Sequence, residues 1–197
     1  DGCGDICILK LEDGTHHCLT STAGGERDPA WSPDGKYIAF TTKRLRGKED
    51  ARSTNSDIFL YDISSRKEIN ITEANRGFDK YPVFSPDGSK IAYQSMERDG
   101  YESDLIRLFV YDIKSGTNSW ITKGWEFDVE SVNWADDQNL YFVSAYLGTS
   151  QVFRTNINDK GVDQVTKGNH ELGSLQVRSG RMTATIVSFS LAPEVAS

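Results

Sequence analysis

One stretch of the sequence decides the fold: Asp28-Pro29-Ala30-Trp31-Ser32-Pro33-Asp34-Gly35-Lys36-Tyr37-Ile38-Ala39-Phe40-Thr41-Thr42. It returns as Tyr81-Pro82-Val83-Phe84-Ser85-Pro86-Asp87-Gly88-Ser89-Lys90-Ile91-Ala92-Tyr93-Gln94-Ser95. Pro-Asp-Gly is typical of a tight turn, because Pro presets φ, Asp bonds nearby backbone and Gly tolerates positive φ. Apolar residues alternate with a period of two around it, so each copy predicts a strand, a turn and a second strand.

A regular spacing joins these two copies to a third, weaker one. The aromatic residues Trp31, Phe84 and Trp134 lie 53 and 50 residues apart. Four short strands in each period of about 40–50 residues are typical of a β-propeller blade. The sequence therefore predicts an all-β fold, a β-propeller with about four blades' worth of four-stranded antiparallel sheets. The three aromatic residues are expected to pack between neighbouring blades.

The strands group into one propeller domain or fragment that covers residues 1–197. The expected segments are a half blade at 5–20, blades at 28–72, 81–122 and 130–166, a half blade at 172–189, and an exit segment at 190–197. The terminal half blades could pair and close a ring of four. We favour an arc cut from a longer propeller, because the chain starts and ends out of phase with the blades. The open edges of such an arc would allow two chains to form a homodimer.

Composition excludes several classes of partner. The 197 residues carry a net charge of −7 with a pI near 5.0. Nucleic acid and anionic membranes both need a basic surface, so we expect neither as the main partner. No apolar run approaches the length of a membrane span. The chain begins at Asp1 without a signal-peptide pattern, so we expect a processed or cut-out chain.

The cysteines Cys3, Cys7 and Cys18 are confined to one end of the chain. Their spacing matches none of the usual zinc patterns, so we expect no metal and no cofactor. Either Cys7 and Cys18 are small buried residues on paired strands, or one disulfide forms and leaves one thiol free. The alternative is a metal-binding module that combines the three thiols with His17.

The Ser-Pro-Asp-Gly copies resemble the repeats of TolB-like proteins and of the N-terminal propellers of the prolyl oligopeptidase family. Two further segments favour the peptidases. Residues Ser95–Asp104 resemble a segment of bacterial dipeptidyl peptidase V-type and acyl-aminoacyl-type enzymes. Residues Ser188–Val195 resemble the propeller exit Ser-x-x-x-Pro-x-Glu-[Ile/Val]-Tyr, although Ala196 stands where Tyr is expected. The resemblance implies a serine peptidase whose α/β-hydrolase domain follows this chain.

The sequence itself carries no catalytic machinery of that family. It has no G-x-S-x-G nucleophile motif, no phosphate loop and no HExxH motif. We expect no catalytic residue here and no hydrolysis by this chain alone. The resemblance implies that the propeller restricts the access of short peptides to the hydrolase domain, in a periplasmic or secreted protein, with a cytoplasmic one as the alternative. The rival function is a TolB-like propeller that binds proteins and has no peptidase attached.

The candidate binding residues lie in the segment that follows the second copy. They are Glu97, Arg98, Tyr101 and Glu102. A desolvated carboxylate opposite an ammonium group is a suitable way to recognise a peptide's free amino terminus. Glu97 and Glu102 are therefore candidates for contact with the substrate, with Arg98 and Tyr101 beside them. The alternative, which we favour, is that an Arg–carboxylate network in this segment only rigidifies a loop.

Overall fold

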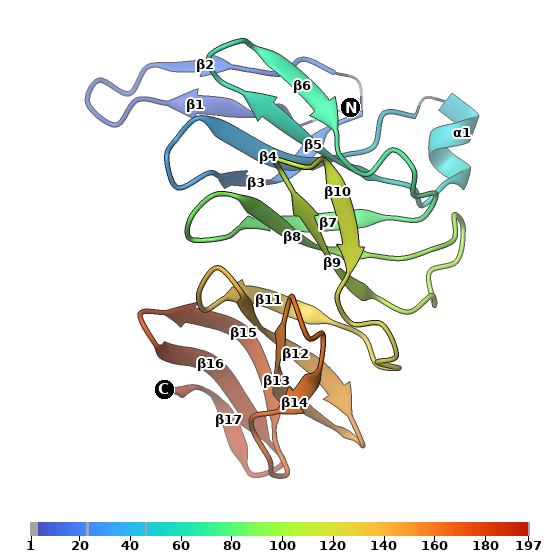
Figure 1. Ribbon diagram of the computed structural model, residues 1–197, viewed down its shortest axis with the longest axis vertical. Coiled ribbons are helices and arrows are strands. Elements are labelled where there is room, and N and C mark those ends of the chain that lie inside the picture. Colours follow the sequence, from blue (N-terminus) through green and yellow to red (C-terminus); the bar gives the residue numbers. More distant parts are fainter. Residues whose placement is uncertain (1–3, 23, 46, 197) are drawn as a thin grey trace. The chain divides into compact units, whose positions relative to one another are not determined.

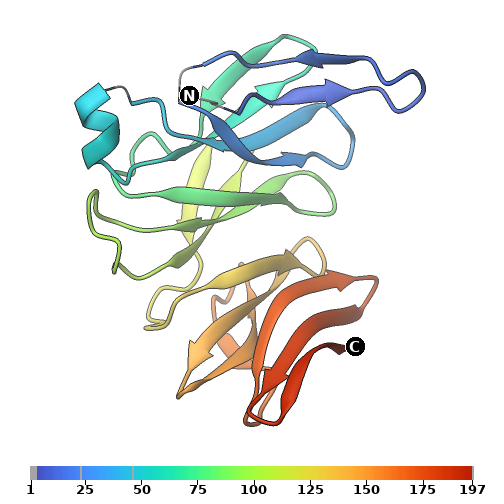
Figure 2. The same ribbon diagram turned by 180° about the vertical axis from the view of Figure 1, so that it is seen from behind.

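A computed structural model describes residues 4–22, 24–45 and 47–196, and its regular secondary structure is almost entirely antiparallel strand (Figures 1 and 2). The chain divides into two compact units. They are Asp1–Pro82 with Ser95–Asp104, and Val83–Gln94 with Leu105–Ser197. Within the described ranges, no helix has both the length and the apolar character that crossing a membrane requires.

The first unit contains a two-stranded sheet and a four-stranded sheet. Strands β1 and β2 pair with each other, and β3 to β6 pair in sequence order. Their bounds are β1 Cys7–Leu9, β2 His16–Cys18, β3 Glu26–Trp31, β4 Tyr37–Thr42, β5 Asp57–Asp62 and β6 Lys67–Asn70. Buried Ile6, Ile38, Phe40 and Tyr61 form the core. The predicted strand order of the first full blade is confirmed.

The repeated Pro-Asp-Gly motif forms the predicted turn in both copies. In the first copy the Ser32 hydroxyl donates to Asp34 Oδ1 at 2.8 Å, and Gly35 has φ of 71°. In the second copy the Ser85 hydroxyl donates to Asp87 Oδ1 at 2.6 Å. A positive φ costs glycine nothing, so the motif provides a turn between the first two strands of a blade.

The second four-stranded sheet has the order β10-β9-β8-β7, and its residues fall in both units. Its bounds are β7 Asp79–Phe84, β8 Lys90–Ser95, β9 Arg107–Asp112 and β10 Thr117–Trp120. This sheet confirms the predicted second blade.

The second unit contains a seven-stranded sheet in which β14 and β15 both pair with β13. Its bounds are β11 Glu130–Trp134, β12 Asn139–Tyr146, β13 Thr149–Asn156, β14 Val162–Gln164, β15 Glu171–Arg178, β16 Arg181–Ser188 and β17 Leu191–Ala196. Strands β11 to β14 form the predicted third blade. Strand β15 joins β13 through a parallel pairing of Ser150 with Glu171. Apolar side chains around Phe142, Phe153 and Leu172 fill the cores on this sheet.

The first strand of each repeat contains a residue in the left-handed conformation. These residues are Asp28, Tyr81, Ser131 and Ser174, with φ of 53°, 56°, 48° and 48°. In β3, β11 and β15 the pairing register shifts at this point, as in a β-bulge. A non-glycine residue in this conformation costs roughly 1–2 kcal/mol, so the surrounding blade must stabilise it. Recurrence in four repeats identifies the left-handed residue as part of the blade architecture.

Two predictions about secondary structure were wrong. The polar composition of residues 43–56 predicts a loop, but they include the short helix α1, Gly47–Arg52. Ala51 and Arg52 are good helix formers, and a basic side chain in the last turn suits the helix dipole. Residues 190–197 were expected to leave the propeller, but β17 folds back and pairs antiparallel with β16.

Strand β17 was missed because it contains Pro193, which cannot donate a ladder hydrogen bond. In the structure this residue falls where the register between β16 and β17 shifts, on a strand at the end of the sheet. Proline is tolerated at such a position. The last predicted half blade therefore has three strands, β15, β16 and β17. If the terminal half blades closed a ring, a strand of the first half blade would have to pair with β16 at the edge that β17 occupies.

The three repeated aromatic residues have different surroundings. Trp134 is 7% exposed and belongs to the core of the second unit, as predicted. Trp31 is 51% exposed, so its predicted role in packing between blades was wrong. Phe84 is half-buried. The same position in the repeat therefore meets different neighbours in different blades.

The cysteines Cys7 and Cys18 form a disulfide across the β1–β2 pair. Both residues are exposed, so the alternative of small buried side chains is wrong, and the alternative in which one disulfide forms is the one observed, on strands that pair as expected. The metal-binding alternative fails for these two thiols because their sulfurs are joined. Cys3 lies outside the described residues, and among those described no His, Cys, Asp and Glu side chains gather into a metal site.

Loss of this disulfide is expected to lower the free energy of unfolding by about 2–3 kcal/mol, because the bond closes a short loop in the unfolded chain. Cys7 and Cys18 are 11 residues apart. Urea unfolding of wild type with and without reductant, beside the double variant Cys7→Ser/Cys18→Ser, checks this. Reductant should shift the wild-type midpoint and leave the variant unchanged. Equal responses would contradict the prediction.

Candidate functional site

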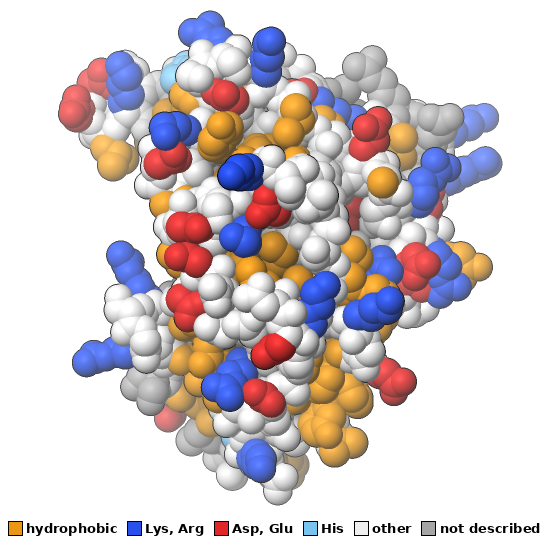
Figure 3. Space-filling model, in the orientation of Figure 1, with side chains coloured by type: hydrophobic (Ala, Val, Ile, Leu, Met, Phe, Trp, Pro, Cys, Tyr) orange, Lys and Arg blue, Asp and Glu red, His pale blue; other side chains and the backbone are white. Residues whose placement is uncertain are grey.

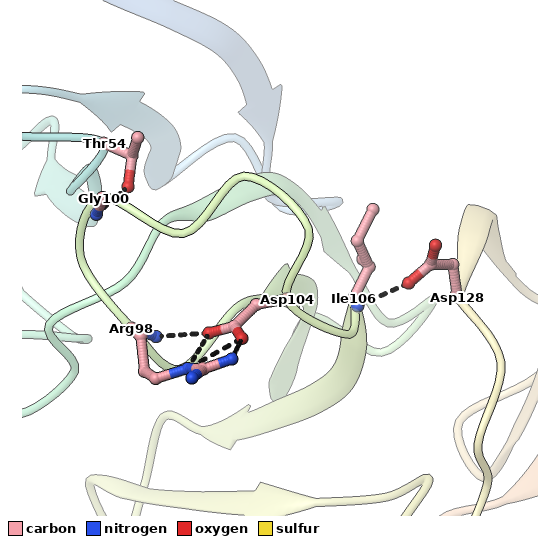
Figure 4. A network of polar contacts seen from close by, with 6 residues as sticks. All are labelled: Thr54, Arg98, Gly100, Asp104, Ile106 and Asp128. Carbon is pink, nitrogen blue, oxygen red and sulfur yellow. Dashed lines mark hydrogen bonds and ion pairs between the residues drawn. The ribbon is translucent and has the colours of Figure 1, made fainter.

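The four candidate residues lie in the connection between β8 and β9, and an ion pair braces this connection from within (Figure 4). The backbone N–H of Arg98 donates to Asp104 Oδ2 at 2.9 Å, and its Nε donates to Oδ1 at 2.8 Å. Hydrogen bonding of the guanidinium to this carboxylate raises the pKa of Arg98 above its usual value. Arg98 also lies over the Tyr101 ring, 4.1 Å from its centroid. Arg98 and Tyr101 thus match the alternative in which an Arg–carboxylate network stabilises the loop.

A second set of contacts fastens this loop to the β4–β5 connection of the preceding repeat. Asp99 Oδ1 accepts a hydrogen bond from the Ser53 hydroxyl and one from the Thr54 backbone N–H, both at 2.7 Å. The Gly100 N–H donates to the Thr54 hydroxyl at 2.8 Å (Figure 4). These hydrogen bonds hold the pKa of Asp99 below its usual value, and the one from the Ser53 hydroxyl has the largest effect. The β4–β5 and β8–β9 connections are therefore held together by hydrogen bonds.

A buried carboxyl anchors the base of both connections. Asp79 is completely buried, and its carboxyl accepts hydrogen bonds from Asn75 Nδ2 at 3.1 and 3.2 Å. The same Asn75 nitrogen donates to the Met96 carbonyl at 2.7 Å. The Asp79 N–H donates to the Ser56 carbonyl at 2.8 Å. Burial raises the pKa of Asp79 to about 7, although hydrogen bonds from Ser95 and Asn75 oppose that shift.

The close approach of the chain at this anchor requires a glycine. A Cβ on Gly77 would lie 2.4 Å from the Met96 carbonyl oxygen, which is backbone and cannot move aside cheaply. Gly77 therefore allows the start of the β8–β9 connection to pack against the segment that leads into β7.

The two connections help to line a polar cavity of about 970 Å³ within the first unit. We call it the charged cavity. Its walls come from β3, the end of β4, β7 and the two connections. Asp28 and Tyr81, the left-handed residues of the first two repeats, both line it. The left-handed residue is thus part of the wall in both repeats, and in β3 it coincides with a bulge, which redirects neighbouring side chains.

The described lining residues carry balanced charge. Three are basic and three are acidic: Arg27, Lys43, Lys80, Glu26, Asp28 and Glu102. Glu26 is held in place by hydroxyl donors from Thr20 and Thr22. On the face shown in Figure 3, basic and acidic side chains are likewise interspersed.

Arg98 and Tyr101 contact each other, whereas Glu97 and Glu102 have different surroundings. Of the four, only Glu102 lines the charged cavity, and within the described part of the chain its carboxylate has no hydrogen bond or ion pair. Glu97 makes other interactions and is not part of the lining. Arg27, Asp28 and Lys80 were not predicted as site residues. Asp28 is the residue ahead of the first proline in the first copy, and Arg27 and Lys80 directly precede that position in the two copies.

The comparisons with known proteins identify the repeat. A family model described as the TolB beta propeller domain matches residues 49–187. The chain belongs to this family. It is 39% identical over 168 residues to a protein named dipeptidyl-peptidase 5 from Porphyromonas gingivalis, covering 85% of this chain and 25% of that protein. The chain therefore spans about a quarter of the length of this relative.

Two solved structures share the fold. A puromycin-hydrolyzing peptidase from Mycobacterium tuberculosis gives a TM-score of 0.76 at 15% identity, over 98% of this chain and 33% of that chain. TolB from Acinetobacter baumannii gives 0.61 at 22% identity, over 93% of this chain and 46% of that chain. The predicted resemblance is confirmed: the chain is a TolB-like β-propeller, homologous to dipeptidyl-peptidase 5, with structural neighbours in the prolyl oligopeptidase family.

Proposed function

We propose that this chain is the non-catalytic propeller part of a dipeptidyl peptidase, that it restricts access to short peptides, and that Glu102 contacts the substrate's free amino terminus. The homology to dipeptidyl-peptidase 5 supports the class of enzyme. The unpaired carboxylate of Glu102 in the charged cavity is the observation that carries the contact. In this proposal a hydrolase domain elsewhere in the protein performs the reaction.

The geometry of the loop supports this role for Glu102. The Arg98–Asp104 pair and the Asp99 contacts fix the connection on both sides of it. A loop that is already rigid loses little backbone entropy when its carboxylate binds an ammonium group, and a charge-assisted hydrogen bond is stronger than a neutral one.

Replacement of Glu102 by Gln in the full-length protein is expected to raise KM for a dipeptidyl substrate with a free amino group about tenfold, the equivalent of about 1.4 kcal/mol. Steady-state kinetics with the free and the N-acetylated substrate measure the effect. Glu97→Gln is the matched control, because Glu97 lies in the same loop and does not line the charged cavity. An unchanged KM in Glu102→Gln, or an equal rise in both variants, would refute the contact.

The cross-strand disulfide supports a periplasmic or secreted location, since such bonds persist in oxidising compartments. Labelling of free thiols in whole cells before lysis tests it. We expect Cys7 and Cys18 to be protected in the native protein, and labelling of both would oppose that location.

The likeness to TolB favours a second candidate, a propeller that binds proteins and has no peptidase attached. The coding sequence downstream of this chain separates the two. A G-x-S-x-G motif in a strand–turn–helix context supports the peptidase, and a stop codon directly after the propeller supports the binding protein.

A further inference from the structure

Two basic residues occupy equivalent positions in successive repeats. Arg27 directly precedes the left-handed Asp28, and Lys80 directly precedes the left-handed Tyr81. Both line the charged cavity. The third repeat has Glu130 at this position. The basic pair is therefore a feature of the two blades around the charged cavity and is not required by the repeat.

Neither basic group is neutralised by the fold. In the part of the chain that the structure describes, Arg27 and Lys80 have no ion pair with a carboxylate. The Lys80 ammonium lies 4.1 Å from the centroid of the Phe78 ring. This contact orients the group and leaves its charge available. Two cations at the bulges thus face a cavity without intramolecular partners.

The remaining lining groups favour a ligand that carries both charges. Asp28 and Glu102 have unpaired carboxylates in the same cavity, so a purely anionic ligand would meet repulsion there. The hydroxyls of buried Thr41 and Thr42, which lie in the wall, have no hydrogen-bond partner within the described residues. Such unsatisfied groups are rare in folded proteins and call for an explanation.

We infer that Arg27 and Lys80 bind a carboxylate of the same short peptide whose ammonium group faces Glu102. This inference rests on the proposed function and deepens it, because it names a zwitterionic peptide as the ligand. Guanidinium groups recognise carboxylates in a bidentate manner. A volume of about 970 Å³ also lies within the range of small-molecule sites. The carboxylate can come from an acidic side chain or from the C-terminus of a dipeptide.

Four probes that present no bond for a dipeptidyl peptidase to cleave separate these groups. Alanyl-alaninol carries only the ammonium group, and N-acetyl-alanyl-alanine carries only a carboxylate. Alanyl-alanine carries the ammonium and a C-terminal carboxylate. Alanyl-glutamate reduced to an alcohol at its C-terminus carries the ammonium and a side-chain carboxylate. Calorimetric titration of the full-length protein gives a dissociation constant for each.

The double variant Arg27→Gln/Lys80→Gln is expected to bind the two zwitterionic probes at least about tenfold more weakly than wild type and to bind alanyl-alaninol unchanged. Loss with only one of the two assigns the source of the carboxylate. The charge-conserving variant Arg27→Lys/Lys80→Arg should retain most of the affinity. Arg178→Gln/Lys114→Gln, which removes two cations outside the charged cavity, should match wild type.

The outcomes for the inference and for the proposed contact differ. If Arg27→Gln/Lys80→Gln binds every probe like wild type, or weakens alanyl-alaninol equally, the carboxylate site is disproved. If Glu102→Gln leaves all free-amine probes unchanged while the double variant loses the zwitterions, the ammonium contact is disproved and the carboxylate site stands.

Discussion

The chain is expected to lose stability as the pH rises from about 4 to about 7, because folding keeps the buried carboxyl of Asp79 protonated. Burial raises the pKa of Asp79 to about 7, whereas an aspartate in an unfolded chain has a pKa near 3.8. Between these values the folded protein binds the extra proton and the unfolded protein does not. The contribution of Asp79 to stability is therefore greatest below about pH 4, falls as pH rises, and becomes level above about pH 7.

The expected loss over this window is on the order of 4 kcal/mol, since each unit of pKa difference corresponds to about 1.36 kcal/mol. Asp57 acts in the same direction, because burial also raises its pKa. The exposed turn residues Asp34 and Asp87 affect stability in a more acidic pH range. Hydrogen bonds, from Lys36 and Ser85 respectively, lower their pKa to about 2, so their contribution is lost only as the pH falls from about 4 towards 2.

Urea unfolding at a series of pH values measures this dependence, and Asp79→Asn identifies its source. The variant has no ionisable group at this position, so its stability should change much less between pH 4 and 7. The comparison uses slopes against pH, because the new amide alters the hydrogen bonds to Asn75 at every pH. Asp34→Asn is the matched control and should keep the wild-type slope in this window. Parallel profiles for Asp79→Asn and wild type would disprove the assignment.

This behaviour bears on the charged cavity. Asn75 links the Asp79 carboxyl to the Met96 carbonyl, at the start of the loop that carries Glu102. We therefore expect ionisation of the buried Asp79 carboxyl to alter the hydrogen bonds by which Asn75 holds the start of that loop. The kinetics proposed for Glu102→Gln are best measured at one pH below 7, where the anchor is protonated in most molecules.

The repeat made the strands predictable, because a blade's alternating pattern and its Pro-Asp-Gly turn are local properties. Strands β4 and β5 begin and end where the pattern places them. The charged cavity was not predictable in the same way, because its walls come from β3, the end of β4, β7 and two connections that are far apart in the sequence. Glu102 was found by its charge, whereas Arg27 and Lys80 belong to strands whose register the sequence does not reveal.

The contacts of Asp99 were also beyond the sequence. Its carboxylate accepts hydrogen bonds from Ser53 and Thr54, about 45 residues earlier in the chain. No local pattern signals a pairing between two connections of neighbouring repeats. The acidic residue with the clearest structural role in the loop therefore looked no different from Glu97 or Glu102.

The different surroundings of the repeated aromatic residues were also not predictable from the sequence. One of these residues, Trp134, gives the largest effect that we expect from a core substitution. Trp134→Ala should lower the free energy of unfolding by about 3–5 kcal/mol, as for other large aromatic side chains removed from a core. Trp134 is 7% exposed, packs in the core with Leu140 and Phe142, and its indole N–H donates to the Val83 carbonyl at 3.1 Å. The substitution would leave a cavity and an unpaired carbonyl.

Trp31→Ala is the matched control, because Trp31 holds the equivalent position in the first repeat and is 51% exposed. Its cost should stay within about 1 kcal/mol, as is usual for exposed side chains. Trp134→Phe separates the two parts of the larger effect, since it keeps most of the apolar volume and removes the hydrogen bond, at an expected cost of about 1–2 kcal/mol. Urea unfolding followed by far-UV circular dichroism measures all three variants. Similar losses of unfolding free energy in Trp31→Ala and Trp134→Ala would contradict this. They would mean that the presence of an aromatic residue at this position of the repeat, and not its burial, determines the stability of each blade.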